Sequence, residues 1–326
     1  MLAKRILLEL AGRAGLAPLA RRATARHLRI LGYHGAWLLP GPPLGECTFI
    51  TPALFERRMT RLKRSGHPVL SLTDAVSRLA DGSLPNGAVV ITIDDGWVST
   101  LTHMVPILEA LELPASLYAT TWYSERDLPV VTQAVRFLAR SGGRPEEEAK
   151  AAIARIEALP VEERLAALRA YGTELGVAEE WLERRQFHIM SASELAEAQR
   201  RGIDIQLHTH RHIEVAAHHG RLGAEIEENR ACLAAALGIQ GFDHFCYPSG
   251  SFHETAPAIL AAAGVRSATL CDPGLNRPGA DPLTLKRLLD GWRVSDAEFD
   301  AYLSGVMHAL SPLSSAAAAL TRVRAR

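Results

Sequence analysis

Two adjacent carboxylates, Asp94 and Asp95, stand directly after an unbroken apolar and β-branched run at residues 88–93. Such a run predicts a strand buried on both faces, and α/β folds bind their ligands at the carboxyl ends of strands. Side chains alternate across a strand, but at its end both carboxylates can reach one cleft. Because two neighbouring carboxylates repel each other, one of them needs a metal ion or a proton. A solvated Asp-Asp-Gly turn is the alternative interpretation.

Three histidines follow a second apolar segment at residues 203–207, in the run His208-Thr209-His210-Arg211-His212. On a helical turn, His208 and His212 would share one face and His210 would point elsewhere. Histidine is the commonest metal ligand among these residue types. Two histidines and a carboxylate suit a catalytic divalent ion with open positions. A solvated polar loop is the alternative, and we interpret the nearby pair at 218–219 in that way.

The elements that must position these residues alternate between strand and helix patterns. Strands are expected at 27–33, 69–72, 88–93, 115–119, 203–207, 244–247 and 266–270, and helices at 52–65, 73–79, 104–111, 222–237 and 256–263. This alternation predicts an α/β fold with a parallel sheet, either open or closed into a barrel. Residues 125–187 carry no strand signal and are rich in Ala, Glu, Arg and Leu. We therefore expect a helical insertion on the rim, with Trp181, Leu182 and Phe187 anchoring its return.

The composition excludes several classes of protein. The chain has 326 residues, 48% of them hydrophobic and 22% charged, which is ordinary for a globular protein and rules out a largely disordered, collagen-like or coiled-coil chain. Lys+Arg and Asp+Glu both total 36, so a general nucleic-acid binder is not expected. The four cysteines form no CxxC pair, which argues against a disulfide framework or a thiolate zinc site.

Both ends of the chain are basic. The first 29 residues hold seven Lys or Arg against one Glu, and the tail ends in three arginines after an Ala-rich run. No signal-peptide core or membrane-spanning stretch is recognised. We expect a cytoplasmic protein with peripheral contact to the inner face of the membrane through these ends. The expected domains are a basic helix at 1–26, a barrel at 27–300 and a helical tail at 301–326.

Three motifs in order give the chain a family resemblance. Thr92 to Gly96 resembles Thr-Phe-Asp-Asp-Gly, with Ile93 in place of Phe, and His208, Thr209 and His212 match His-[Ser/Thr]-x-x-His. Residues 247–250 match a Tyr-Pro-x-Gly motif found in one branch. The chain thus resembles the polysaccharide deacetylases of the NodB-homology type (carbohydrate esterase family 4-like) over residues 27–295. The resemblance implies a distorted (β/α)7-type barrel that carries the helical insertion.

The resemblance also implies roles for individual residues. Asp95, His208 and His212 would bind a divalent metal, with Zn²⁺ expected first and Co²⁺ or Ni²⁺ as alternatives. Asp94 would be the general base that activates a metal-bound water. A backbone N–H at Ser249 or Tyr247, with Ser249 at the family position, would stabilise the oxyanion. Thr209 would orient its neighbours.

The sequence departs from the family pattern in three places. Cys246 stands where many members carry an arginine that pairs with the base, and Arg287 is the candidate replacement. The late Leu-x-His motif that supplies the general acid is missing; past residue 270 only His308 remains, in an expected tail helix, which leaves His253 or Asp94 itself as candidates. The gap between the two main motifs is long because it contains the insertion.

The motifs and the resemblance together predict an enzyme, a metal-dependent hydrolase that removes acetyl from an N-acetylated amino sugar. The substrate is expected to be polymeric or lipid-linked, as in an envelope polysaccharide or glycolipid. Removal of formyl from a sugar and hydrolysis of a small amide are alternatives within the same chemistry. A non-catalytic carbohydrate-binding relative is the alternative from another class. The presence of Asp94 argues against it, because a pure binder needs the metal ligands but not the base.

Overall fold

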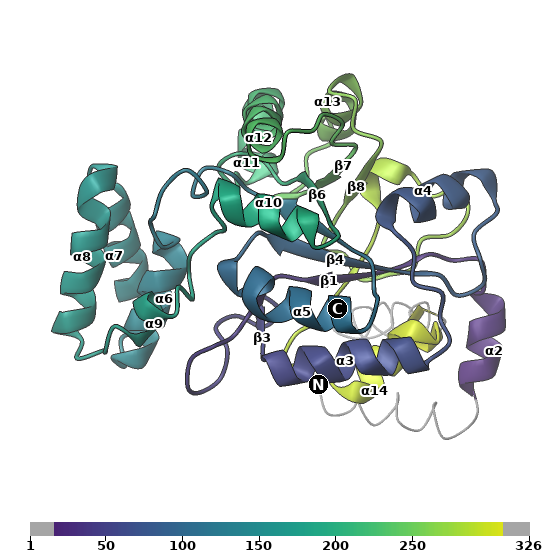
Figure 1. Cartoon of the computed structure of the whole chain (residues 1–326), viewed down its shortest axis with the longest axis horizontal. Helices are drawn as coiled ribbons and strands as arrows, with labels where there is room; N and C mark the ends of the chain where they lie inside the picture. The colour runs from purple at the N-terminus through teal and green to yellow at the C-terminus, as the bar shows by residue number, and fades with distance from the viewer. Residues whose placement is uncertain (1–15, 309–326) are drawn as a thin grey trace, which may run out of the picture.

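One parallel sheet of seven strands forms the centre of the molecule (Figure 1). The computed structural model describes residues 16–308. The strand order is β8-β7-β6-β5-β4-β1-β9, and a separate pair is formed by β2 and β3. The strands are β1 (Arg29–Tyr33), β2 (Gly35–Ala36), β3 (Phe49–Ile50), β4 (Val89–Asp95), β5 (Ala115–Ala119), β6 (Ile203–Leu207), β7 (His244–Cys246), β8 (Ser267–Thr269) and β9 (Leu288–Leu289).

The sheet curls until its two edges meet. β9 pairs with β1 at one edge, and Leu285, just before β9, forms a parallel bridge with Thr269 at the end of β8. The fold is therefore the distorted (β/α) barrel that the family resemblance implied, which is the closed one of the two arrangements that the strand–helix alternation allowed.

The buried strand β4 sorts its side chains between two cores. Ile91 and Ile93 belong to the large core between the sheet and the helices, whereas Val90 belongs to a smaller core with Tyr118 and Cys246 from neighbouring strands. Asp94 follows Val90 at even spacing, so its side chain continues the row that faces the smaller core.

Helices cover the outside of the sheet (Figure 1). Thr51 and Ser71 cap α3 and α4 by accepting backbone N–H groups three residues on. The helix expected at 73–79 begins earlier, at Leu72, and is capped by Ser71. The strand expected at 69–72 is reduced to a single bridge between Val69 and Val89. The helices around the barrel are α2 (Leu16–Ala23), α3 (Pro52–Arg64), α4 (Leu72–Asp81), α5 (Val105–Ala110), α10 (Ala192–Arg200), α11 (Val215–His218), α12 (Leu222–Leu237), α13 (Ala256–Ala262) and α14 (Asp296–Leu303).

The expected insertion is helical and projects from one side of the barrel (Figure 1). It consists of α6 (Val131–Ser141), α7 (Glu146–Glu157), α8 (Val161–Glu174) and α9 (Glu180–Glu183). Trp181 and Phe187 are buried in its core, as expected, and Leu182 packs against it. Because Trp97 and Ile189 belong to the same core, the insertion is joined to the loop that follows Asp95.

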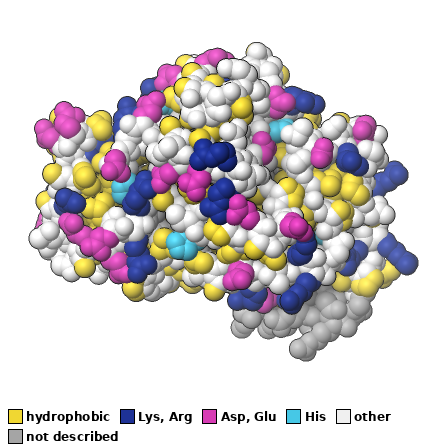
Figure 2. Space-filling model, in the orientation of Figure 1, with side chains coloured by type: hydrophobic (Ala, Val, Ile, Leu, Met, Phe, Trp, Pro, Cys, Tyr) yellow, Lys and Arg dark blue, Asp and Glu magenta, His cyan; other side chains and the backbone are white. Residues whose placement is uncertain are grey.

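The predicted basic ends lie mostly outside the described residues, which exclude 1–15 and 309–326. The helix α14 spans residue 300, where the barrel was expected to end and the tail to begin. The Tyr302 hydroxyl in this helix contacts the backbone of Ile30 in β1. Acidic and basic side chains are interspersed over the face in Figure 2, in keeping with the balanced charge. Within residues 16–308, no helix has the length and apolar character needed to cross a bilayer.

Candidate active site

Asp95, His208 and His212 meet at the carboxyl ends of β4 and β6. The Nε2 atoms of both histidines lie 3.3 Å from Oδ1 of Asp95. This oxygen is buried and has no hydrogen-bond partner among the described residues, while Oδ2 accepts a hydrogen bond of 2.8 Å from the Trp97 indole. An orphaned carboxylate oxygen facing two imidazole nitrogens fits a divalent cation.

The loop after β6 is not the helical turn that the i, i+4 spacing suggested. Thr209 and His212 both adopt positive φ angles, 60° and 55°, and these two left-handed residues fold the loop so that both imidazoles face Asp95. Asn229 from α12 holds the loop by accepting the N–H of His208 at 3.0 Å. The hydroxyl of Thr209 is buried without a partner among the described residues, so the orienting contact expected of it is absent.

Hydrogen bonding sets the tautomer of His208. Its Nδ1 lies 2.8 Å from the carbonyl oxygen of Cys246, so Nδ1 carries the proton and donates it. In the neutral ring Nε2 can offer its lone pair to a cation, and in the protonated ring Nε2 donates to Asp95 instead. Burial raises the pKa of Asp95, but the two imidazoles outweigh burial and hold that pKa well below its usual range. Burial lowers the pKa of His212, and contact with Asp95 reverses this to a net rise.

The second carboxylate, Asp94, has a cation of its own. Nη1 and Nη2 of Arg287 donate to its two oxygens at 2.8 Å each, with both side chains almost fully buried. Burial raises the pKa of Asp94, but the Arg287 guanidinium, together with nearby imidazoles, lowers that pKa by more than burial raises it. The net shift is downward, and Asp94 is ionised at neutral pH. Cys246 contacts Arg287 Nη2 at 3.0 Å. The structure therefore brings Arg287 to the carboxylate from a position far along the chain.

One further side chain at this site was missed by the sequence analysis. His34 follows β1, and its Nε2 lies 3.7 Å from Oδ2 of Asp94. Its Nδ1 is buried without a partner among the described residues, and 16% of the side chain is exposed. The signal was available: His34 directly follows β1, Asp94 lies at the end of β4, and neighbouring parallel strands place their carboxyl ends together.

Other predicted residues lie in different settings. Ser249 sits in the turn after β7 with φ 56°, and the N–H of Tyr247 already donates to Thr269, which leaves Ser249 as the candidate oxyanion donor. His253 stacks on His219 at 3.7 Å and contacts Thr255. His308 packs against His27, which precedes β1.

A cavity of about 270 Å³ lies between Asp95 and the insertion. Asp95 and His212 line it, and the insertion supplies Thr132, Gln133 and Glu157. The insertion thus forms part of the wall of a cavity next to Asp95.

The comparisons with known proteins identify the family of the chain. A family model for polysaccharide deacetylase matches residues 81–268, and the chain belongs to this family. The matched segment contains both carboxylates and the His208–His212 loop but not His34 or Arg287. A hydrolase of acetylated carbohydrate is the class of enzyme that the family defines.

Solved deacetylase structures share the fold. The Streptococcus pyogenes deacetylase PplD in complex with acetate has 17% identity and a TM-score of 0.60, covering 86% of this chain and 99% of that one. IcaB from Ammonifex degensii has 21% identity and a TM-score of 0.58, covering 85% and 97%. A de-N-acetylase from Aggregatibacter actinomycetemcomitans has 16% identity and a TM-score of 0.57, covering 85% and 99%. No curated protein matches the sequence.

Proposed function

We propose that the chain is a metal-dependent N-deacetylase of an amino sugar, and that Asp95, His208 and His212 hold the ion. The observation that carries the proposal is the buried Oδ1 of Asp95, which lacks a partner and faces two imidazole Nε2 atoms at 3.3 Å. One carboxylate and two imidazoles are suited to Zn²⁺, Co²⁺ or Ni²⁺. Asp94, His208 and Cys246 are also close together, but the Arg287 guanidinium contacts both Asp94 and Cys246 and disfavours a cation there.

When bound, the ion acts as a Lewis acid that polarises the acetamide carbonyl and lowers the pKa of water. Asp94 accepts a proton from the attacking water, whose oxygen adds to the acetyl carbon. Arg287 is a positioning residue: its two hydrogen bonds fix the carboxylate plane and keep it ionised. The N–H of Ser249 donates to the oxyanion that forms.

The C–N bond must then break, and the leaving nitrogen needs a proton. We assign this donor role to His34, because its Nε2 lies 3.7 Å from Asp94 and its side chain is partly open to solvent. At 3.7 Å the transfer needs one bridging water, through which a proton taken by Asp94 can reach His34 and then the amine, so the products are acetate and a free amino sugar. This assignment fills the place left by the missing late histidine motif.

The decisive variant is Asp94→Asn, which removes the base and keeps the shape of the side chain. We expect metal content near one equivalent in both proteins and a fall in amine release from N-acetylated oligosaccharides of roughly 10²-fold or more. Full activity in Asp94→Asn would contradict the base assignment. Metal and sugar binding without turnover in the wild type would instead favour the non-catalytic binder, and a preference for N-formyl over N-acetyl substrates would favour the deformylase.

Contact with a membrane surface and a lipid-linked substrate belong to the proposal as well. Within the described part of the chain, α2 exposes Leu16 and Leu19 by 41% and 63%, and Arg22 lies on the same short helix. This combination supports peripheral binding to anionic lipid. Leu16→Ser/Leu19→Ser should weaken sedimentation with anionic vesicles, and unchanged sedimentation would remove this part of the proposal.

A further inference from the structure

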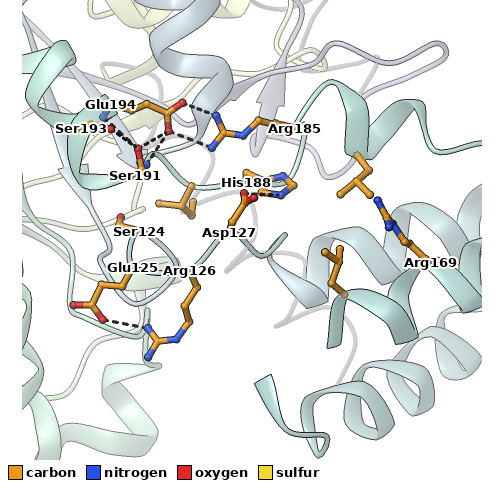
Figure 3. A pocket seen from close by; sticks show the side chains of 13 residues that line it. Ser124, Glu125, Arg126, Asp127, Arg169, Arg185, His188, Ser191, Ser193 and Glu194 are labelled. Carbon is orange, nitrogen blue, oxygen red and sulfur yellow. Dashed lines mark hydrogen bonds and ion pairs between the residues drawn. The ribbon is translucent and has the colours of Figure 1, made fainter. Parts of the chain in front are cut away.

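A second cavity, of about 620 Å³, lies between the helical insertion and the barrel (Figure 3). Its wall is formed by the loop at 124–127, by α8, and by the segment that leads from α9 into α10. Ile189 lines both this cavity and the one that contains Asp95. The two cavities are therefore neighbours on either side of one buried side chain.

The wall of the second cavity is hydrogen-bonded to the active-site loop. The N–H of Met190 donates to Gly96 at 2.8 Å, and the N–H of Val98 donates to His188 at 2.9 Å. These bonds bracket the bridge between Trp97 and Ile189. A ligand held against His188 thus lies on a segment fixed directly to the residues that follow Asp95.

The charges around the cavity cancel. Three arginines and three carboxylates line it: Arg126, Arg169, Arg185, Glu125, Asp127 and Glu194. Arg185 pairs with Glu194 and Arg126 with Glu125, and Arg169 lies 3.5 Å from Glu179. With its cations already paired, the cavity has little to select a phosphate or a uronate. An uncharged polar ligand fits this balance better.

Two polar side chains at the cavity retain hydrogen-bonding capacity. His188 is 4% exposed and its Nδ1 has no partner among the described residues. Its Nε2 lies 3.8 Å from Asp127 Oδ1, too far for a direct hydrogen bond, and Figure 3 shows the two groups facing each other. Burial lowers the pKa of His188 to about 4, so the ring is neutral and can donate and accept.

We propose that this cavity is a second carbohydrate-binding subsite, which holds an uncharged sugar unit of the same chain whose N-acetyl group reaches Asp95. Hydroxyl groups of the sugar would bond to His188, Asp127 and Arg169, and its C–H face would pack on Leu165, Leu182 and Ile189. This inference rests on the proposed function and narrows it: the substrate is a neutral oligomer or polymer, and the insertion is what selects it.

The test uses N-acetylglucosamine oligomers of increasing length with the full-length, metal-loaded protein. Asp127→Ala and Arg169→Ala each shorten an exposed cavity side chain, and Glu56→Ala, an exposed carboxylate on α3, is the matched control. In wild type and control, kcat/KM should rise by about tenfold or more from the single sugar to the longer oligomers. In the two cavity variants most of that rise should be lost through KM, with activity on the single sugar unchanged.

Two results would overturn the subsite. One is a chain-length dependence in the cavity variants equal to that of the control; the other is an equal loss at every length, including the single sugar. If no oligomer is turned over by wild type, the proposed function fails for this sugar, and calorimetric titration of the longest oligomer still decides the subsite. Binding that is weakened by Asp127→Ala/Arg169→Ala and not by Glu56→Ala supports it, and absence of binding refutes it.

Discussion

Arg29 and Arg287 are both fully buried, but their guanidinium groups lie at opposite ends of the sheet and have opposite kinds of partner. Arg29, at the start of β1, donates to the carbonyl oxygens of Thr24, His27 and Leu303 and to one hydroxyl, all uncharged. Burial consequently lowers the pKa of Arg29 to about 10. Arg287 instead holds the carboxylate of Asp94 at the other end.

The difference between the two arginines suggests that the amino ends of the strands serve stability and the carboxyl ends serve chemistry. At the amino ends of the strands, Arg29 is satisfied by carbonyl oxygens and one hydroxyl and ties α2 and α14 to the barrel, and among the described residues there Nδ1 of His27 is the exception without a partner. At the carboxyl ends, the side chains of Asp95 and His34 keep buried polar atoms without partners among the described residues. Unmet hydrogen-bonding capacity of this kind is costly, and its concentration at one end marks the place where a ligand completes the structure.

The largest effect is expected at the carboxyl end, from His208→Ala. This change removes one of three metal ligands, so metal content should fall from near one equivalent to near none. Deacetylation should fall by more than the roughly 10–100-fold typical of changes around a metal's ligands. Elemental analysis and amine release measure both quantities, with His103→Ala as control. Full metal content in His208→Ala would contradict the proposal that His208 binds the metal at the carboxyl end of the sheet.

A smaller loss is expected from His34→Gln, which removes the assigned proton donor and leaves the metal ligands in place. Amide hydrolysis should fall by roughly 10²-fold. An activated acetate ester has a leaving group that needs no proton, so its hydrolysis should fall much less. Rates on both substrates, with metal content measured alongside, distinguish this role from a structural one. Equal losses on amide and ester would count against His34 as the donor.

Arg29→Met should affect stability and spare chemistry. Two or more buried acceptors would lose their donor, at about 1–3 kcal/mol each in unfolding free energy. Urea unfolding measures this loss, and Arg22→Met, on the exposed side of α2, is the control. The kcat/KM of the folded variant at low temperature should match wild type. A lower kcat/KM without loss of stability would contradict the assignment of this end to stability.

The sequence was sufficient to predict those site residues whose position depends only on their place at the end of a strand. Asp94 and Asp95 end the buried strand β4, His208 and His212 follow β6, and parallel strands bring their carboxyl ends together. The partnership of Arg287 with Asp94 could only be suggested, because the residues are 193 positions apart and meet only when β9 joins β1. The left-handed residues Thr209 and His212 were not predictable either, since their conformation depends on contacts with Asn229 and Asp95.

The way the insertion packs on the barrel could not be predicted from the sequence either. Its helices could be predicted from Pro145 and Pro160 followed by glutamates. Its contribution of Glu157 to the cavity at Asp95 depends on how the insertion packs against Trp97 and Phe49, which no local pattern encodes. The division of the chain at residues 27 and 300 stays a prediction.

The smallest effect is expected from His67→Gln, at the amino end. Nδ1 of His67 donates to Gly87 at 2.6 Å and Nε2 accepts from Arg21 at 2.8 Å, so the ring is neutral in the folded state. Burial lowers its pKa from 6.5 to about 4. Between these two values the unfolded chain binds more protons than the folded one. The stability that His67 contributes is therefore complete above pH 6.5 and is lost as pH falls toward 4.

Gln keeps a donor and an acceptor but does not titrate, so His67→Gln should flatten the fall in unfolding free energy between pH 6.5 and 4. The difference in slope is at most about 1.4 kcal/mol per pH unit, the value for one proton. His188, whose pKa is also lowered to about 4 by burial, should preserve part of the slope in the variant. Urea titrations across this range provide the measurement, with the same change at exposed His218 as control. An unchanged slope would mean that His67 binds its proton equally in both states, and that this end of the sheet does not set the acid limit of stability.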